Sequence, residues 1–230
     1  ANQQFFPHEF MYKILRSGHA EEAMRQLRAR MKIHVFHDDQ HGTAIVVGAA
    51  LLNGIAVAGK DIKKVKLVTS GAGAAALACL GLLVKLGVPR ENIWVTDLAG
   101  VVWQGRTELM DPDKQEFAQP TSHRSLADVI AGADVFLGLS AAGVLKPDMV
   151  RSMAAKPIIF ALANPTPEIM PEEIKLVRDD ALVATGRTDY PNQVNNVLCF
   201  PYIFRGALDC GATTINDAME IAVVHAIADL

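Results

Sequence analysis

Residues 66–76 read Lys-Leu-Val-Thr-Ser-Gly-Ala-Gly-Ala-Ala-Ala, a strand-like run that passes into a turn of glycine and alanine. The turn fits the pattern Gly-x-Gly-x-x-Ala, in which the first glycine makes the tight turn and the second lets a pyrophosphate approach the backbone. The small third residue keeps the following helix close to the strand, and the N–H groups at the start of that helix attract an anion. The predicted dinucleotide contacts are Gly71, Ala72, Gly73, Ala74 and Ala75.

An acidic residue follows the turn at the spacing that a dinucleotide site needs. Asp97 ends the next predicted strand, about twenty residues on, where a carboxylate can bind a ribose hydroxyl. The alternative is that glycine and alanine only pack the helix on the strand, but the strand before, the helix after and the acid together favour cofactor binding. Arg106 lies shortly after Asp97 and could receive a 2′-phosphate, so NAD and NADP both stay open.

Short apolar runs alternate with helical patterns around this unit. Strands are expected at 66–70, 93–96, 135–139, 158–161 and 182–185. Helices are expected at 74–86, 125–131, 147–154, 171–177 and 215–230. This rhythm is typical of a parallel sheet with helices on both faces. The predicted fold class is therefore α/β, a Rossmann-like, doubly wound and mostly parallel sheet.

The segments upstream have a different character. Residues 43–58 are a nearly unbroken run of apolar and small side chains, too long for a typical strand and too short for a membrane span, which predicts a buried helix. Residues 1–30 carry scattered aromatic, basic and alternating charged side chains, as in an exposed linker helix or interaction arm. The predicted organisation is an arm at 1–30 and an NAD(P)-binding domain at 31–230.

The composition argues against several partners. A net charge of −3 without a run of Lys or Arg gives no basic surface for nucleic acid. The first residues lack the pattern of a secretion signal, and the apolar segments are interrupted by polar residues, so no membrane partner is expected. Cys79, Cys199 and Cys210 lack close pairing and lie in apolar sequence, which predicts reduced core thiols and a cytoplasmic protein.

Imidazole and carboxylate side chains gather in residues 37–41, His-Asp-Asp-Gln-His, just before the predicted helix at 43–58. The aspartates could cap that helix, because acids at a helix start accept N–H bonds. Alternatively, Asp38 or Asp39 binds a hard cation such as Mg²⁺ or Mn²⁺, which prefers carboxylate oxygen. A third hypothesis is a zinc site made by His34, His37 and His41. The spacing alone leaves all three open.

Two loops rich in asparagine follow predicted strands. Residues 162–167 carry Asn164, and residues 190–196 carry Asn195 and Asn196. Ligands of open α/β sheets bind beyond the carboxyl ends of the strands, where both loops are expected. An amide offers a donor and an acceptor, which suits a carboxylate or a carboxamide, although Asn and Pro also serve simply to make turns.

Several segments together resemble the malic enzymes, in particular their bacterial branch. These are residues 35–44 (VFHDDQHGTA), the turn at 71–76, residues 163–166 (ANPT) and residues 189–196 (DYPNQVNN). They follow one another in order, and the resemblance extends from Leu27 to the end of the chain.

The resemblance implies oxidation of malate with NAD or NADP, followed by decarboxylation to pyruvate and CO₂ with Mg²⁺ or Mn²⁺. It implies that Asp39, with Asp38 beside it, supplies a metal ligand, because such a metal polarises the C2 oxygen and stabilises the enolate. It further implies that Asn164 reaches the nicotinamide or the substrate, and that Asn195 or Asn196 binds a malate carboxylate.

The chain also departs from the family pattern. Family members carry a catalytic Tyr and Lys and an acidic pair upstream, and no segment before Leu27 matches them, so the catalytic acid and base stay unassigned. We therefore expect a cofactor-binding part that needs a completing domain or a further subunit of a homo-oligomer. The alternatives are a malolactic-type enzyme, which releases lactate, and a non-catalytic dinucleotide-binding module.

Overall fold

The computed structural model describes residues 24, 26, 27, 29–31 and 34–230, and the arm predicted at 1–30 lies almost entirely outside them. Within the described residues, one six-stranded sheet has the order β3-β2-β1-β4-β5-β6. The strands are β1 (Leu67–Ser70), β2 (Ile93–Asp97), β3 (Gly100–Val101), β4 (Val135–Gly138), β5 (Ile158–Ala161) and β6 (Leu182–Thr185). The boundary at residue 31 stays a prediction.

The sheet is parallel apart from one edge. Neighbouring strands pair in parallel from β2 to β6, and β3 runs antiparallel against β2. All four residues of β1 are buried, because Leu67 faces one apolar core and Val68 faces the other. The predicted Rossmann-like, mostly parallel sheet is confirmed. The edge strand β3 was not predicted, since two residues are too few to carry a periodic pattern.

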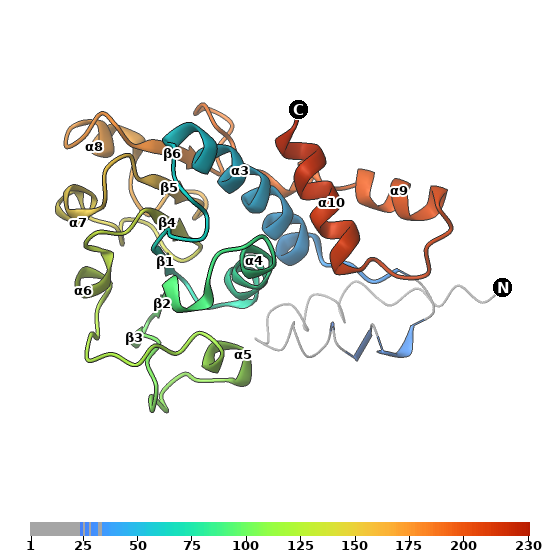
Figure 1. The fold of residues 1–230 in the computed structure, drawn as a ribbon, viewed down its shortest axis with the longest axis horizontal. Coiled ribbons are helices and arrows are strands. Elements are labelled where there is room, and N and C mark those ends of the chain that lie inside the picture. The colour runs from blue at the N-terminus through green and yellow to red at the C-terminus, as the bar shows by residue number, and fades with distance from the viewer. Residues whose placement is uncertain (1–23, 25, 28, 32–33) are drawn as a thin grey trace.

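Helices cover both faces of the sheet, with α3, α4 and α10 gathered on one side and α6, α7 and α8 on the other (Figure 1). The α-helices of this part of the chain are α3 (Thr43–Ala58), α4 (Ala74–Lys85), α5 (Pro112–Gln115), α6 (Leu126–Ile130), α7 (Pro147–Ser152), α8 (Pro171–Lys175), α9 (Tyr202–Asp209) and α10 (Asp217–Ala228). Shorter helical turns are the π-helix η1 (Asp38–Gly42) and the 3-10 helices η2 (Arg90–Asn92) and η3 (Asn196–Leu198).

The long apolar segment forms the buried helix α3, with the predicted bounds. By length and composition alone, Asp38–Ala58 could cross a membrane, but 56% of its apolar 18-residue stretch is buried inside the fold. α3 packs against α4 and α10, and side chains such as Ile45 and Leu51 have no exposed surface. Its apolar composition is thus accounted for by a central place in one of the two cores.

The cysteines differ from the expectation in one respect. Cys79 in α4 and Cys199 are buried free thiols, as predicted, but Cys210 is exposed at the end of α9. The prediction for Cys210 was wrong because α9 is a surface helix whose apolar residues only partly face the core. Burial raises the pKa of both Cys79 and Cys199 to about 12.

Candidate functional site

A cleft of about 450 Å³ lies at the carboxyl end of the sheet. Its walls come from the segments that follow β1, β2 and β4, and its lining includes Ser70, Gly71, Ala72, Gly73, Asp97, Leu98, Leu109, Lys114 and Ser140. β1 has β2 on one side and β4 on the other, so the chain reverses its direction across the sheet at this point. Such a switch point is where open α/β sheets bind ligands.

The two glycines of the turn have distinct roles in the geometry. Gly71 has φ +112°, and a Cβ there would lie 2.4 Å from the carbonyl oxygen of Leu139, so only glycine fits. Gly73 precedes α4 without a side-chain cap, and a Cβ there would meet nothing within 4 Å. The first N–H groups of α4 therefore border open space, as an anion site at a helix start requires. Ala74 and Ala75 form the first turn of α4, directly after Gly73.

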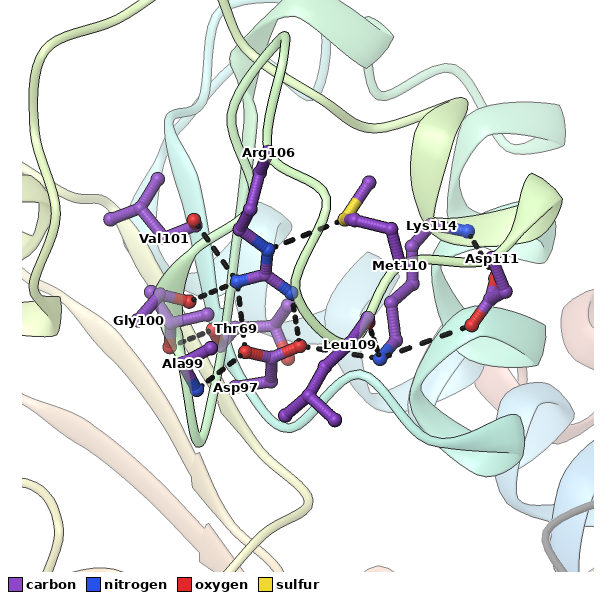
Figure 2. A network of polar contacts seen from close by, with 11 residues as sticks. Thr69, Asp97, Ala99, Gly100, Val101, Arg106, Leu109, Met110, Asp111 and Lys114 are labelled. Atoms are coloured by element: carbon purple, nitrogen blue, oxygen red, sulfur yellow. Dashed lines mark hydrogen bonds and ion pairs between the residues drawn. The ribbon is translucent and has the colours of Figure 1, made fainter.

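Asp97 ends β2, and both of its carboxylate oxygens already have donors (Figure 2). Oδ1 accepts hydrogen bonds from Arg106 Nη1 and from the N–H of Ala99, both at 2.9 Å. Oδ2 accepts from Arg106 Nη2 at 2.5 Å and from Lys114 Nζ at 3.2 Å. Burial raises the pKa of Asp97, but the bonds from Arg106, Ala99 and Lys114 together outweigh it and lower the pKa below its usual value. The carboxylate is therefore charged, and its acceptor capacity of about four sites is taken up.

The cations of this cluster differ in exposure and reach. The Arg106 side chain is 4% exposed, and its Nη1 also donates to the carbonyl oxygens of Gly100 and Val101. Arg106 is thus committed to Asp97 and the β3 backbone, rather than free for a ligand. Lys114 lines the cleft from α5, 17 residues beyond Asp97, and sequence reasoning missed it because a single Lys in a four-residue helix carries no pattern. Lys114 Nζ also donates to the carbonyl oxygen of Leu109 at 2.7 Å and lies 3.9 Å from Asp111 Oδ2, so two cations and two carboxylates leave the cluster without a net charge (Figure 2).

Asn164 lies away from the residues that line this cleft, in the loop after β5. It is exposed, and its amide group lies beside Gly186, where a Cβ would be 3.2 Å from Asn164 Nδ2. Arg187 Nη1 donates to the carbonyl oxygen of Pro165 at 3.3 Å. The loops after β5 and β6 therefore meet at Asn164, at the carboxyl end of the sheet.

A second polar region is formed by residues 37–42 and 195–198, which we call the η1/η3 corner. Asn196 Nδ2 donates a short hydrogen bond to Asp38 Oδ2, although the two residues are 158 positions apart. Asn195 Oδ1 accepts from the N–H of Val197 at 3.1 Å, and Asp39 is exposed. The structure thus brings the predicted metal-binding segment together with two of the three predicted substrate asparagines, Asn195 and Asn196, whereas Asn164 lies in the loop after β5.

The corner contains buried polar atoms without a partner. Within the described part of the chain, His37 Nε2 and Asp38 Oδ1 are buried and have no hydrogen bond. Burial raises the pKa of Asp38, and the bond from Asn196 opposes this effect. The capping hypothesis for the aspartates is wrong, because neither η1 nor α3 has a side-chain cap and the segment forms a π-helical turn instead.

The three histidines do not assemble into a zinc site. His34 Nε2 bonds to the carbonyl oxygen of Ala212 at 2.8 Å, whereas His41 Nδ1 lies 3.2 Å from the N–H of His37. No group of three or more His, Cys, Asp or Glu side chains in the described ranges could hold a metal ion. A metal at the corner would therefore need ligands beyond those residues.

Comparisons with known proteins agree on one family. The model of the malic enzyme NAD-binding domain matches residues 40–230. An NAD-dependent malic enzyme of Rhizobium meliloti is 66% identical over 91% of this chain and 27% of its own length. An NADP-dependent malic enzyme of Haemophilus influenzae is 64% identical over 90% of this chain and 27% of its own length.

A solved structure gives the same result for the fold. The crystal structure of Entamoeba histolytica malic enzyme superposes with a TM-score of 0.86 at 38% identity, over 95% of this chain and 49% of that one. The chain thus spans between about a quarter and a half of the length of these relatives. The family model, the relatives and the fold agree, and the chain belongs to the malic enzyme NAD-binding domain family.

Proposed function

We propose that this chain binds NADP or NAD in the cleft beside β1 and supplies part of the metal and malate site for oxidative decarboxylation of malate to pyruvate and CO₂. The observation that carries the proposal is the uncapped start of α4, which borders the cleft at the switch point of the sheet. Backbone N–H groups at a helix start bind a pyrophosphate without any charged side chain. Residues outside the described ranges, or a partner subunit, complete the second site.

The charges beside Asp97 favour NADP. A ribose 2′-hydroxyl would need a free acceptor on Asp97, but its oxygens are already bonded to Arg106, Ala99 and Lys114. A 2′-phosphate would instead meet the ammonium group of Lys114, the cation of the cluster that lines the cleft, which also contacts Asp97 and Asp111. One charge-assisted bond contributes about 1.5–3 kcal/mol, which is a factor of about ten or more in affinity.

The η1/η3 corner fits one part of a divalent metal site. Asp38 Oδ1 has no hydrogen-bond donor among the described residues, and Asp39 is exposed, so two carboxylates are available to a hard cation. A divalent metal held here would supply a Lewis acid for the C2 oxygen of malate. Asn196 orients Asp38 through its amide, and Asn195 and Asn164 offer uncharged donors to a carboxylate or a carboxamide.

Fluorescence titration with NADPH and NADH tests the cofactor site. NADPH should bind about tenfold more tightly than NADH, and Lys114→Gln should remove that preference with little effect on NADH. Lys175→Gln is the matched control, because it removes the same charge from the exposed face of α8. If neither dinucleotide binds, the assignment of the Gly71–Gly73 turn is wrong; if Lys175→Gln has the same effect, the preference is only a general effect of charge.

Turnover is the second arm of the test. We expect the chain alone to reduce NADP⁺ and NAD⁺ only slightly with malate and Mn²⁺, because the acid and base are unassigned and each contributes a factor of about 10² to 10⁴. Rapid malate-dependent reduction of either cofactor would show that the η1/η3 corner needs no further residues or partner subunit for turnover. Lactate formation without net NADH would instead support a malolactic-type reaction.

A further inference from the structure

Glu168 is buried beneath the rim of the cleft, and the chemistry proposed above does not use it. It lies in the loop after β5 that also carries Asn164, and its exposed fraction is 0%. Burial raises the pKa of Glu168, and the N–H groups that it binds oppose this effect. A buried carboxylate is unfavourable unless its oxygens have donors, so its contacts indicate what it holds in place.

The Glu168 side chain joins the loops that follow β4 and β5. Oε1 accepts a hydrogen bond from the N–H of Ser140 at 2.9 Å, and Oε2 accepts one from the N–H of Ala163 at 3.0 Å. Gly138 makes room for this group, because a Cβ there would lie 2.4 Å from the Glu168 Cδ. The carboxylate therefore fixes the separation between the two loops, one oxygen for each.

The β4 loop in turn supports the cofactor turn. Ser140 Oγ lies 2.8 Å from Ser70 Oγ, and both residues line the cleft. The carbonyl of Leu139 is the group against which Gly71 packs. A continuous set of contacts thus leads from Glu168 to the turn that faces the pyrophosphate.

The β5 loop leads in the other direction. Ala163, whose N–H is held by Glu168, directly precedes the exposed Asn164. We infer that Glu168 is a positioning residue, which holds the Gly71 turn and Asn164 at the separation that a bound dinucleotide spans. The inference rests on the proposed cofactor site and adds a residue to it. A role in packing alone would not tie Glu168 to the affinity for a ligand.

Glu168→Gln tests the inference with almost no change in volume. A side-chain amide has one acceptor oxygen and an NH₂ group, so it can accept from Ser140 or from Ala163 but not from both. NADPH should bind the Glu168→Gln chain about tenfold more weakly than the unmodified chain. Asn164→Ala should weaken NADPH binding to the unmodified chain but add little in the Glu168→Gln background, because one loop is already released.

Val150→Ala is the matched control for lost stability. Val150 is fully buried in α7, in the apolar core that α6, α7 and α8 form against the sheet, and does not line the cleft. Its loss should lower the midpoint of thermal unfolding and leave NADPH affinity unchanged. If Glu168→Gln does not fold, Ser140→Ala decides, because it breaks the contact with Ser70 at an exposed position.

The outcomes separate this inference from the proposed function. If the Glu168→Gln chain binds NADPH as tightly as the unmodified chain, the positioning role is overturned and the cofactor site stays intact. The same holds for Ser140→Ala where it takes the place of Glu168→Gln. Glu168 would be only a packing residue if Val150→Ala weakened NADPH binding as much as Glu168→Gln does. The same would follow if the losses of affinity from Glu168→Gln and Asn164→Ala were fully additive. An unmodified chain that binds no NADPH would overturn the proposed function itself, and the positioning role with it.

Discussion

The cleft beside β1 and the η1/η3 corner differ in how completely their polar groups are paired. The carboxylate of Asp97 in the cleft has a donor for each oxygen, and so has the buried Glu168, which holds the cleft residue Ser140. In the corner, Asp38 Oδ1 and His37 Nε2 are buried without a partner within the described residues. Unpaired buried groups are unfavourable, and proteins keep them chiefly where a ligand, a water or another segment pairs with them.

From this difference we expect the chain to hold the whole of the proposed cofactor site but only part of the proposed metal and malate site. The cleft is built by consecutive segments of one sheet, so the residues that line it arrive together when the sheet forms. The corner joins segments 158 residues apart and supplies at most two carboxylates, whereas a Mg²⁺ ion takes about six ligands. The cleft should therefore bind a dinucleotide by itself, whereas the η1/η3 corner should need further ligands to hold a metal.

The largest expected effect comes from the two glycines of the cleft. Gly73→Ala should leave the unfolding free energy within about 0.5 kcal/mol of the original, since its Cβ meets no protein atom, yet weaken NADPH binding at least tenfold by contact with the pyrophosphate. Gly71→Ala should also destabilise the chain by about 1–3 kcal/mol, because φ is +112°. Denaturant unfolding with NADPH titration measures both. If Gly73→Ala binds NADPH with unchanged affinity, the pyrophosphate does not lie against Gly73, and the cleft is not the complete site of the two.

Ligand-induced stabilisation compares the two regions directly. NADPH at about 100 times its Kd should stabilise the chain by about 2.7 kcal/mol, whereas Mn²⁺ alone should raise the unfolding midpoint very little, because the described corner offers only Asp38 and Asp39. Thermal unfolding with each ligand is the measurement, and Asp39→Ala is the control for any effect of Mn²⁺. Strong stabilisation by Mn²⁺ that Asp39→Ala abolishes would show that the corner is already complete.

A smaller effect should follow from breaking the hydrogen bond between Asn196 and Asp38, which joins the two segments of the corner. Asn196→Ala removes the donor from Asp38 Oδ2 and should cost about 1–3 kcal/mol of unfolding free energy, since the carboxyl group then loses this hydrogen bond. Asp38→Asn in the Asn196→Ala background should restore part of the loss, because an amide carries no charge. If the two substitutions add independently, the contact between Asp38 and Asn196 does not stabilise the corner.

Much of the fold could be predicted because local signals and tertiary structure agree. The strands at 158–161 and 182–185 and the helix at 43–58 have their predicted bounds, since uninterrupted apolar runs define them. The helix predicted at 125–131 is shorter, Leu126–Ile130, because Ser125 forms the cap rather than the first turn. Motifs with fixed spacing, such as the glycine turn, also predicted which residues face the cleft.

The partners of the charged residues could not be predicted in the same way. Arg106 and Asp97 are close in sequence, but nothing in the spacing shows that the guanidinium binds the carboxylate instead of a ligand. Lys114 and Glu168 are common residues outside any motif, and their importance arises only from what the fold places beside them. For residues 37–41, the spacing left capping, a hard-cation site and a histidine cluster open; the structure excludes capping and the histidine cluster, and the metal role of Asp38 and Asp39 stays a proposal.

The smallest expected effect is a difference in the rate at which the two regions open locally, which thiol labelling measures. Cys79 lies in α4 behind the cleft and Cys199 beside the corner, and burial raises the pKa of both to about 12, so their intrinsic reactivity is similar. In a Cys210→Ser chain, a thiol reagent should label Cys199 about five- to tenfold faster than Cys79, because a region with unpaired buried groups opens at a lower free energy. NADPH should slow the labelling of Cys79 more than that of Cys199, since it binds at the start of α4. Equal rates, or faster labelling of Cys79, would mean that the unpaired atoms of the corner do not weaken it, and the corner would then be as complete as the cleft.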